Sequence, residues 1–153
     1  MKKSKKGILS IILSFIMLFI ITGCGKTVIT ESDFRHKAEN HNYEVVDVTN
    51  EYNAGRVEKV LTINLRGGEI YFYIFPDEVA ANNLFDDGQR YYESLKGGLS
   101  SELSSSMGNY STYALTSDGY YMYICRVDNT VVAAKVKESS KEIVKTFIKE
   151  LGY

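Results

Sequence analysis

The side chains in this sequence that could most readily bind a metal or act in catalysis are two histidines and two cysteines. His36 and His41 lie five residues apart in TESDFRHKAENH, a helix-like stretch, so they point in different directions. Asp33 and His36 lie three residues apart and could share one face, but two ligands do not make a metal site. The pattern therefore favours a solvated helix face, and we expect no metal here.

Cys24 stands directly after an apolar segment near the start of the chain. Four lysines lie within residues 2–6, and residues 8–21 carry no charge. A helix over that segment spans about 21 Å, which is short of the roughly 30 Å hydrocarbon core of a bilayer. The segment thus has the length and the order of charges that are typical of a signal peptide, and it is shorter than a transmembrane helix.

The residues Ile21-Thr22-Gly23-Cys24 resemble the lipobox of bacterial lipoproteins, in which an aliphatic residue and two small residues precede a cysteine. The resemblance covers residues 1–24. It implies cleavage between Gly23 and Cys24, a diacylglyceryl group on the Cys24 thiol and no other cofactor. Two acyl chains anchor a protein stably, so the implied location is the extracytoplasmic face of the cell membrane. The alternative is an uncleaved signal anchor.

The resemblance divides the chain into a signal peptide (1–23), a lipidated N-terminus with a short tether (24–30) and a single domain (31–153). The tether reaches roughly 20 Å, so we expect the domain to stay close to the membrane. Residues 1–23 carry four lysines and no acid, which leaves 14 basic and 19 acidic residues and a net charge of −5. That balance argues against nucleic acid, and against anionic lipid as the main partner.

Cys125 lies in the strand-like run GYYMYICRV and has no partner in the chain if Cys24 is acylated. A buried thiol that acts as a small hydrophobe is favoured over a reactive nucleophile. The sequence also has no Gly-rich phosphate loop, no His-Glu-x-x-His and no nucleophile elbow. We therefore assign no catalytic residue.

Hydrophobic periodicity predicts the elements of the domain. Helices are expected at 30–41, 77–95 and 139–151, and strands at 43–48, 57–65, 69–75, 110–117, 120–127 and 131–136. The last helix has an apolar stripe of Ile143, Val144, Phe147, Ile148 and Leu151. Residues 96–109 hold five serines and three glycines, which predicts a long loop, disordered rather than functional.

The expected order is α-βββ-α-βββ-α in a single domain. Short turns such as Gly67-Gly68 and Asp118-Gly119 join neighbouring strands, and such turns require antiparallel pairing. We therefore predict an α+β fold, with a mainly antiparallel sheet and the helices packed on one face of it.

Tyrosine is the one strong enrichment, with twelve tyrosines and no tryptophan. Tyr71, Tyr73, Tyr121 and Tyr123 alternate along two predicted strands. Alternating aromatic residues pack well on a pleated sheet, and packing is the favoured interpretation. The same four rings are also a possible ligand platform, because aromatic rings stack on sugar rings and peptide side chains.

The layout is similar to that of small uncharacterised lipoproteins of Gram-positive bacteria, a similarity that implies no activity. The favoured function is a non-catalytic, membrane-anchored domain that binds an envelope protein or a cell-wall component. The alternative is a small cell-envelope hydrolase or modifying enzyme without a legible active site. A solute receptor of an importer is disfavoured, because such receptors usually have two lobes.

Overall fold

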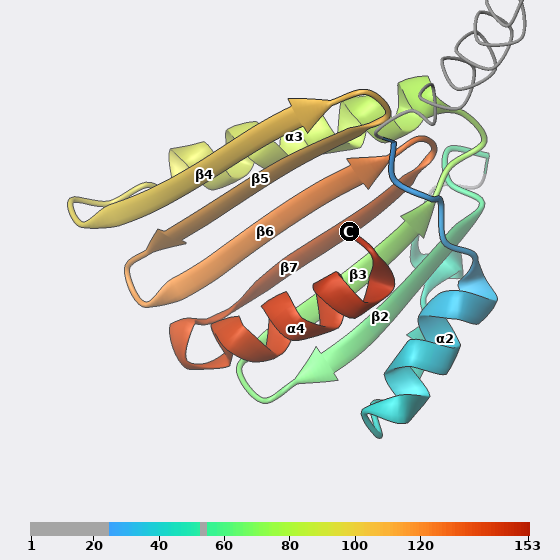
Figure 1. Cartoon of the computed structure of the whole chain (residues 1–153), viewed down its shortest axis with the longest axis horizontal. Coiled ribbons are helices and arrows are strands. Elements are labelled where there is room, and N and C mark those ends of the chain that lie inside the picture. Colours follow the sequence, from blue (N-terminus) through green and yellow to red (C-terminus); the bar gives the residue numbers. More distant parts are fainter. Residues whose placement is uncertain (1–24, 53–54) are drawn as a thin grey trace, which may run out of the picture.

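A computed structural model of the chain describes residues 25–52 and 55–153. The predicted signal peptide, with Gly23 and Cys24, lies outside the described residues. The described part forms a seven-stranded antiparallel sheet with three α-helices (Figure 1), which confirms the predicted α+β class. None of the helices described in these two ranges is long and apolar enough to cross a membrane.

The sheet runs β1-β2-β3-β7-β6-β5-β4, and each strand is antiparallel to its neighbours. The strands are β1 (Val45–Asp47), β2 (Lys59–Leu65), β3 (Gly68–Ile74), β4 (Ser100–Met107), β5 (Tyr110–Ser117), β6 (Tyr120–Val127) and β7 (Thr130–Lys137). The helices are α2 (Glu31–Asn40), α3 (Glu78–Ser94) and α4 (Lys141–Leu151), with short 3-10 turns at η1 (Thr49–Glu51) and η2 (Glu138–Ser140). After β3 the chain crosses through α3 to the far edge and returns strand by strand, so that β7 pairs with β3.

The prediction of a loop at residues 96–109 is wrong for most of its length. Ser100–Met107 form β4, an edge strand paired with β5, and the observed order is α-βββ-α-ββββ-α. All eight residues of β4 are exposed, so its serines lose no hydration on folding. The backbone hydrogen bonds to β5 form whatever the side chains are, and a polar edge strand therefore leaves no hydrophobic alternation to detect.

The helices lie on both faces of the sheet, which corrects the prediction of one helical face. α2 and α4 pack on one side, here called the α4 face, and α3 packs on the opposite side, the α3 face (Figure 1). The reason is that central strands are apolar on both sides. β6 buries Tyr121 and Cys125 on the α4 face, and Met122 and Ile124 on the α3 face. Each apolar face needs its own cover.

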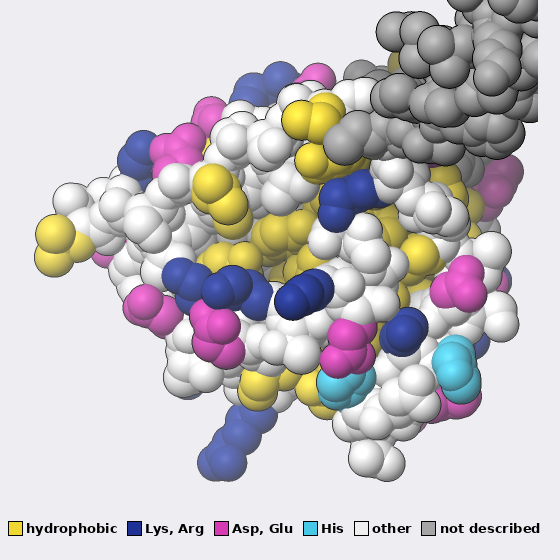
Figure 2. Space-filling model, in the orientation of Figure 1, with side chains coloured by type: hydrophobic (Ala, Val, Ile, Leu, Met, Phe, Trp, Pro, Cys, Tyr) yellow, Lys and Arg dark blue, Asp and Glu magenta, His cyan; other side chains and the backbone are white. Residues whose placement is uncertain are grey.

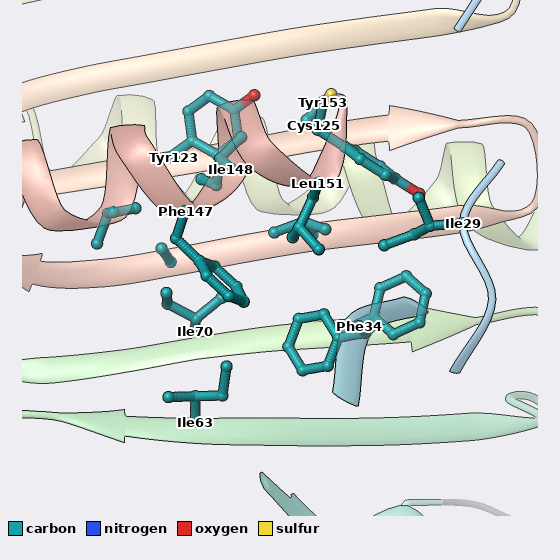
Figure 3. Close-up of a cluster of buried hydrophobic side chains, with 14 of the residues drawn as sticks. Ile29, Phe34, Ile63, Ile70, Tyr123, Cys125, Phe147, Ile148, Leu151 and Tyr153 are labelled. Atoms are coloured by element: carbon teal, nitrogen blue, oxygen red, sulfur yellow. The ribbon is translucent and has the colours of Figure 1, made fainter. Parts of the chain in front are cut away.

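Aromatic rings join the helices of the α4 face to the sheet. Phe34 of α2 stacks on Phe72 of β3, with ring centroids 4.9 Å apart, and Phe147 of α4 meets Phe34 edge-on at 5.7 Å. Figure 3 shows Phe34 and Phe147 beside Ile63 and Ile70 of the strands. The predicted stripe of α4 is buried at Val144, Phe147, Ile148 and Leu151. Its other member, Ile143, is 48% exposed.

α3 is held close to the sheet by its N-cap and by a glycine. The Asp77 carboxylate accepts a hydrogen bond of 2.8 Å from the Ala80 amide, which satisfies a free donor of the first turn. At Gly88 the helix lies so near β6 that a Cβ atom would come within 2.5 Å of Ile124 Cδ1. The helix therefore packs mainly against β5, β6 and β7.

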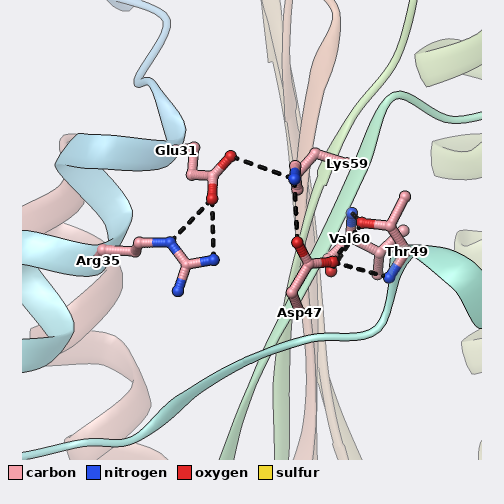
Figure 4. A network of polar contacts seen from close by, with 6 residues as sticks. All are labelled: Glu31, Arg35, Asp47, Thr49, Lys59 and Val60. Atoms are coloured by element: carbon pink, nitrogen blue, oxygen red, sulfur yellow. Dashed lines mark hydrogen bonds and ion pairs between the residues drawn. The ribbon is translucent and has the colours of Figure 1, made fainter.

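A polar network joins α2 to the β1–β2 edge of the sheet (Figure 4). Lys59 Nζ lies 2.9 Å from an Asp47 oxygen and 3.5 Å from a Glu31 oxygen, and Glu31 also pairs with Arg35 at 2.8 Å. The hydroxyl and the amide of Thr49 donate to Asp47. Together with Lys59 they hold the pKa of the Asp47 carboxyl well below its usual range. Since each charge here faces an opposite one, the network serves to position α2.

The first described residues lie against the domain. The Lys26 amide donates to Asn109 Oδ1 at 2.9 Å, and Asn109 Nδ2 donates back to the Lys26 carbonyl at 2.8 Å. The Lys26 ammonium donates to the Gly152 carbonyl at 3.0 Å. Ile29 is buried in the α4-face core with Tyr153 (Figure 3). The described part of the predicted tether thus follows the surface of the domain.

Candidate functional site

A groove opens on the α3 face, between α3 and the strands β3 and β7. We call it the tyrosine groove. Its volume is about 570 Å³, which falls in the range of pockets that bind small molecules. Its aromatic and polar lining comes from the sheet and from the helix, and comprises Asn64, Glu69, Tyr71, Tyr73, Tyr91, Tyr92 and Lys135.

The sheet wall of the groove is a row of parallel rings on β3. Tyr71 and Tyr73 are half-buried, with centroids 5.9 Å apart and planes 20° apart. Phe75 continues the row beside Tyr73 at 6.1 Å and 19°. The Tyr71 hydroxyl donates to the Glu69 carboxylate at 2.6 Å, and Tyr52 meets Tyr73 edge-on at 5.9 Å. These contacts fix the positions of Tyr71 and Tyr73 along the sheet wall of the groove.

The helix wall and the floor carry the opposing groups. Tyr91 of α3 is exposed, and the Lys135 ammonium of β7 lies 5.4 Å from its ring centroid and 3.3 Å from its hydroxyl. Tyr92 is buried and its hydroxyl donates to the Ala134 carbonyl at 3.2 Å. The groove therefore presents aromatic rings from two sides, with an ammonium group and a carboxylate within it.

The environment raises the pKa values of Tyr71, Tyr73 and Tyr92. The hydrogen bond to Glu69, followed by burial, raises the pKa of Tyr71 to about 12. Burial is the main cause that raises the pKa values of Tyr73 and Tyr92 further. A neutral phenol at physiological pH donates a hydrogen bond and stacks, whereas a general base or a nucleophile needs a lowered pKa. The groove is suited to recognition.

The structure separates the four tyrosines of the predicted platform. Tyr71 lies opposite Ala133 of β7 and Tyr123 lies opposite Ala134, and neighbouring residues of a strand point to opposite faces. Tyr71 and Tyr73 are thus on the α3 face. Tyr121 and Tyr123 are on the α4 face, only 5% and 8% exposed. The sequence predicted that each pair alternates along its strand. Whether the two pairs lie on the same face of the sheet depends on how β7 pairs with β3 and β6.

The other residues considered as possible metal ligands or nucleophiles lie away from the groove. His41 lies 2.8 Å from Glu150 and stacks on Tyr43, and Asp33 caps α2 through Thr30. Cys125 is buried on the α4 face, where burial raises the pKa of its thiol. Within residues 25–52 and 55–153, no group of three or more His, Cys, Asp or Glu side chains is placed to hold a metal ion.

Several groove residues gave no signal in the sequence. Lys135 looks like an ordinary outward lysine of a strand, and Tyr91 like an exposed helix residue. Glu69 and Asn64, which are cross-strand partners, flank a hairpin turn. Only the crossover of α3 over β7 brings Tyr91 to Lys135, and no local pattern reports that crossover.

No protein-family model matches this sequence, and no curated protein matches it. Among solved structures, a GTP binding regulator from Thermotoga maritima is similar to it, at 17% sequence identity and a TM-score of 0.43. The similarity covers 81% of this chain and 88% of that chain. At this level it carries no argument about function, so function has to be inferred from the groove.

Proposed function

We propose that the protein is a lipid-anchored extracytoplasmic domain, held by Cys24, that binds a cell-wall glycan in the tyrosine groove without catalysis. The observation that carries the binding proposal is the facing arrangement of Tyr71 and Tyr73 on the sheet and Tyr91 on the helix. The anchoring proposal is supported by the lipobox resemblance of residues 21–24.

A glycan fits the chemistry of the groove. Parallel tyrosine rings offer flat apolar surfaces, on which the C–H faces of sugar rings stack while their hydroxyls stay polar. The Glu69 carboxylate accepts hydrogen bonds from such hydroxyls, and the Lys135 ammonium and the Asn64 amide donate to them. Pockets of this kind combine an apolar lining with a few fixed polar groups that orient the ligand.

A non-catalytic role is supported by the state of the groups that converge there. The tyrosine pKa values are raised, which disfavours their use as bases. The Lys135 Nζ atom lies over the rings of Tyr91 and Tyr120, 5.4 and 5.9 Å from their centroids, and these cation–π contacts help to hold it in place. In that position the ammonium can orient a polar ligand in the groove.

Tyrosine fluorescence tests the binding proposal, because the chain has no tryptophan. We expect solubilised cell-wall glycan fragments to change the emission of residues 25–153 in a saturable way. Tyr71→Ser and Tyr91→Ser should each weaken binding about tenfold, as stacking contacts at a binding centre do. Tyr110→Ser, on the opposite face of the sheet, is the control. Equal weakening by all three variants, or no saturable change in the parent, would refute the proposal.

The anchor is tested in cells that produce the whole chain. Cys24→Ala should abolish lipid attachment, and globomycin, which blocks the lipoprotein peptidase, should make an acylated precursor accumulate. Intact-mass measurement distinguishes these products. Wild-type protein that retains residues 1–23 and carries no lipid mass would contradict the anchoring proposal and leave the groove proposal standing.

A further inference from the structure

A second groove lies on the α4 face, between α4 and the β4–β5 hairpin. We call it the lysine groove, and its volume is about 610 Å³. Figure 2 shows an apolar hollow bordered by a row of basic side chains. Its floor includes Ala114, Tyr121, Tyr123 and Ile148, and its rim includes Lys26, Lys145 and Lys149.

Lysines stand at both ends of the groove and along its α4 side. The Lys26 ammonium lies 5.1 Å from the centroid of Tyr110 at one end. At the other end the Lys141 ammonium lies 5.3 Å from the centroid of Tyr121 and donates to Thr116 at 3.0 Å. Lys145 pairs at 3.0 Å with Glu142, which also lines the groove, whereas Lys149 makes no salt bridge with any residue that the structure describes. The groove thus combines an aromatic floor with a rim that carries three lysines and one glutamate.

Two exposed apolar side chains flank the rim. Leu103 is 66% exposed and Met107 is 51% exposed, both on the edge strand β4. Leu103 lies directly opposite Ala114 and Met107 opposite Tyr110, and both partners line the groove. Since opposite residues of paired strands share a face, Leu103 and Met107 project on the α4 face beside the lysines. Exposed apolar groups next to basic ones are the composition of membrane-surface segments.

The start of the described chain lies at this same groove. Gly25 lies so near Asn109 that a Cβ atom on it would come within 3.0 Å of Asn109 Oδ1, and the backbone of Lys26 forms two hydrogen bonds with the Asn109 side chain. The residue before Gly25 is Cys24, so an acyl group on that thiol would enter a bilayer next to the Lys26 end of the groove.

We propose that the α4 face binds the surface of an anionic lipid bilayer. Lys26, Lys145 and Lys149 attract the headgroup phosphates, and Leu103 and Met107 enter the interfacial region. The net charge of −5 does not oppose this, because charges beyond about 8 Å are screened at physiological salt and the groove presents lysines locally. In its placement beside Cys24 this inference rests on the proposed anchor.

Co-sedimentation of residues 25–153 with vesicles tests the inference without the anchor. Both cores of the fold are built from these residues, so the segment contains the whole domain. We expect binding to phosphatidylglycerol vesicles at low salt, weaker binding at high salt and little binding to phosphatidylcholine vesicles. Acylation of Cys24 is not involved in this assay, so its failure and the failure of the anchor are observed separately.

The variants are matched for charge. Lys145→Ala with Lys149→Ala should weaken vesicle binding about 30-fold. Arg90→Ala with Lys96→Ala, which removes two positive charges on the α3 side, should change it less than about threefold. Leu103→Ser should weaken it about tenfold, with unchanged circular dichroism as the check on folding.

Three outcomes would overturn the inference. Equal binding to phosphatidylglycerol and phosphatidylcholine vesicles would show that binding does not depend on the headgroup charge. Equal weakening by the two double variants would show that no particular face is used. Competition by soluble glycerol phosphate as strong as that by vesicles would show a site for a free anion.

Discussion

Phe147→Ala should destabilise the domain by about 3–5 kcal/mol, the usual cost of removing a buried phenylalanine. The ring is fully buried, with Phe34 edge-on at 5.7 Å and Tyr43 edge-on at 5.9 Å. Its removal loses burial, leaves a cavity among three elements and breaks these edge contacts, each worth about 0.5–1.5 kcal/mol. For a domain of ordinary stability, about 5–15 kcal/mol in total, this is a large share.

Ile143→Ala is the matched control on the same helix. Its side chain is apolar but 48% exposed, so its removal should cost about 1 kcal/mol or less. The measurement is urea unfolding of residues 25–153 followed by circular dichroism, with the slope compared between variants. If Phe147→Ala does not fold, Phe147→Leu provides a smaller step in the same direction. Equal losses at positions 147 and 143 would refute the assigned buried face of α4.

Three further predictions concern the turns and the tyrosines. Gly68→Ala should cost about 3 kcal/mol or more in urea unfolding, because its Cβ would overlap the Lys135 carbonyl, whereas Gly98→Ala, with open space around it, should be nearly neutral. Burial raises the pKa of Tyr121 to about 12, so stability that is complete below pH 10 should fall as the pH rises toward 12, and Tyr121→Phe should reduce that slope. Asn109→Ala should speed amide hydrogen exchange in residues 26–30, and unchanged exchange would contradict the docked position of that segment.

Periodicity predicted the elements that bury one regular face. Phe147 and Val144 recur at helical spacing, and Tyr71 and Tyr73 alternate along a strand, so the helices and most strands were readable from local pattern. β4 was not readable, because its serines bury nothing and its pairing comes from the backbone. Hydrophobic periodicity reflects which residues are buried, and β4 has no buried residues to produce such a pattern.

The candidate site was readable only in part. The half-buried rings of Tyr71 and Tyr73 line the tyrosine groove, while Tyr121 and Tyr123 lie in the floor of the lysine groove. Which face each pair occupies depends on β7, which pairs with β3 on one side and with β6 on the other. That arrangement is a property of the sheet order, which sequences far apart in the chain determine together.

The two proposals constrain each other through the sheet. Within residues 25–52 and 55–153, the three helices leave a groove on each face of the sheet, and the two grooves differ in chemistry. If the α4 face lies on the bilayer, the tyrosine groove on the opposite face is directed away from the membrane. The two grooves have no lining residue in common. Vesicle binding should therefore be unchanged when a glycan fragment saturates the tyrosine groove, and mutual competition would mean that both ligands use one face.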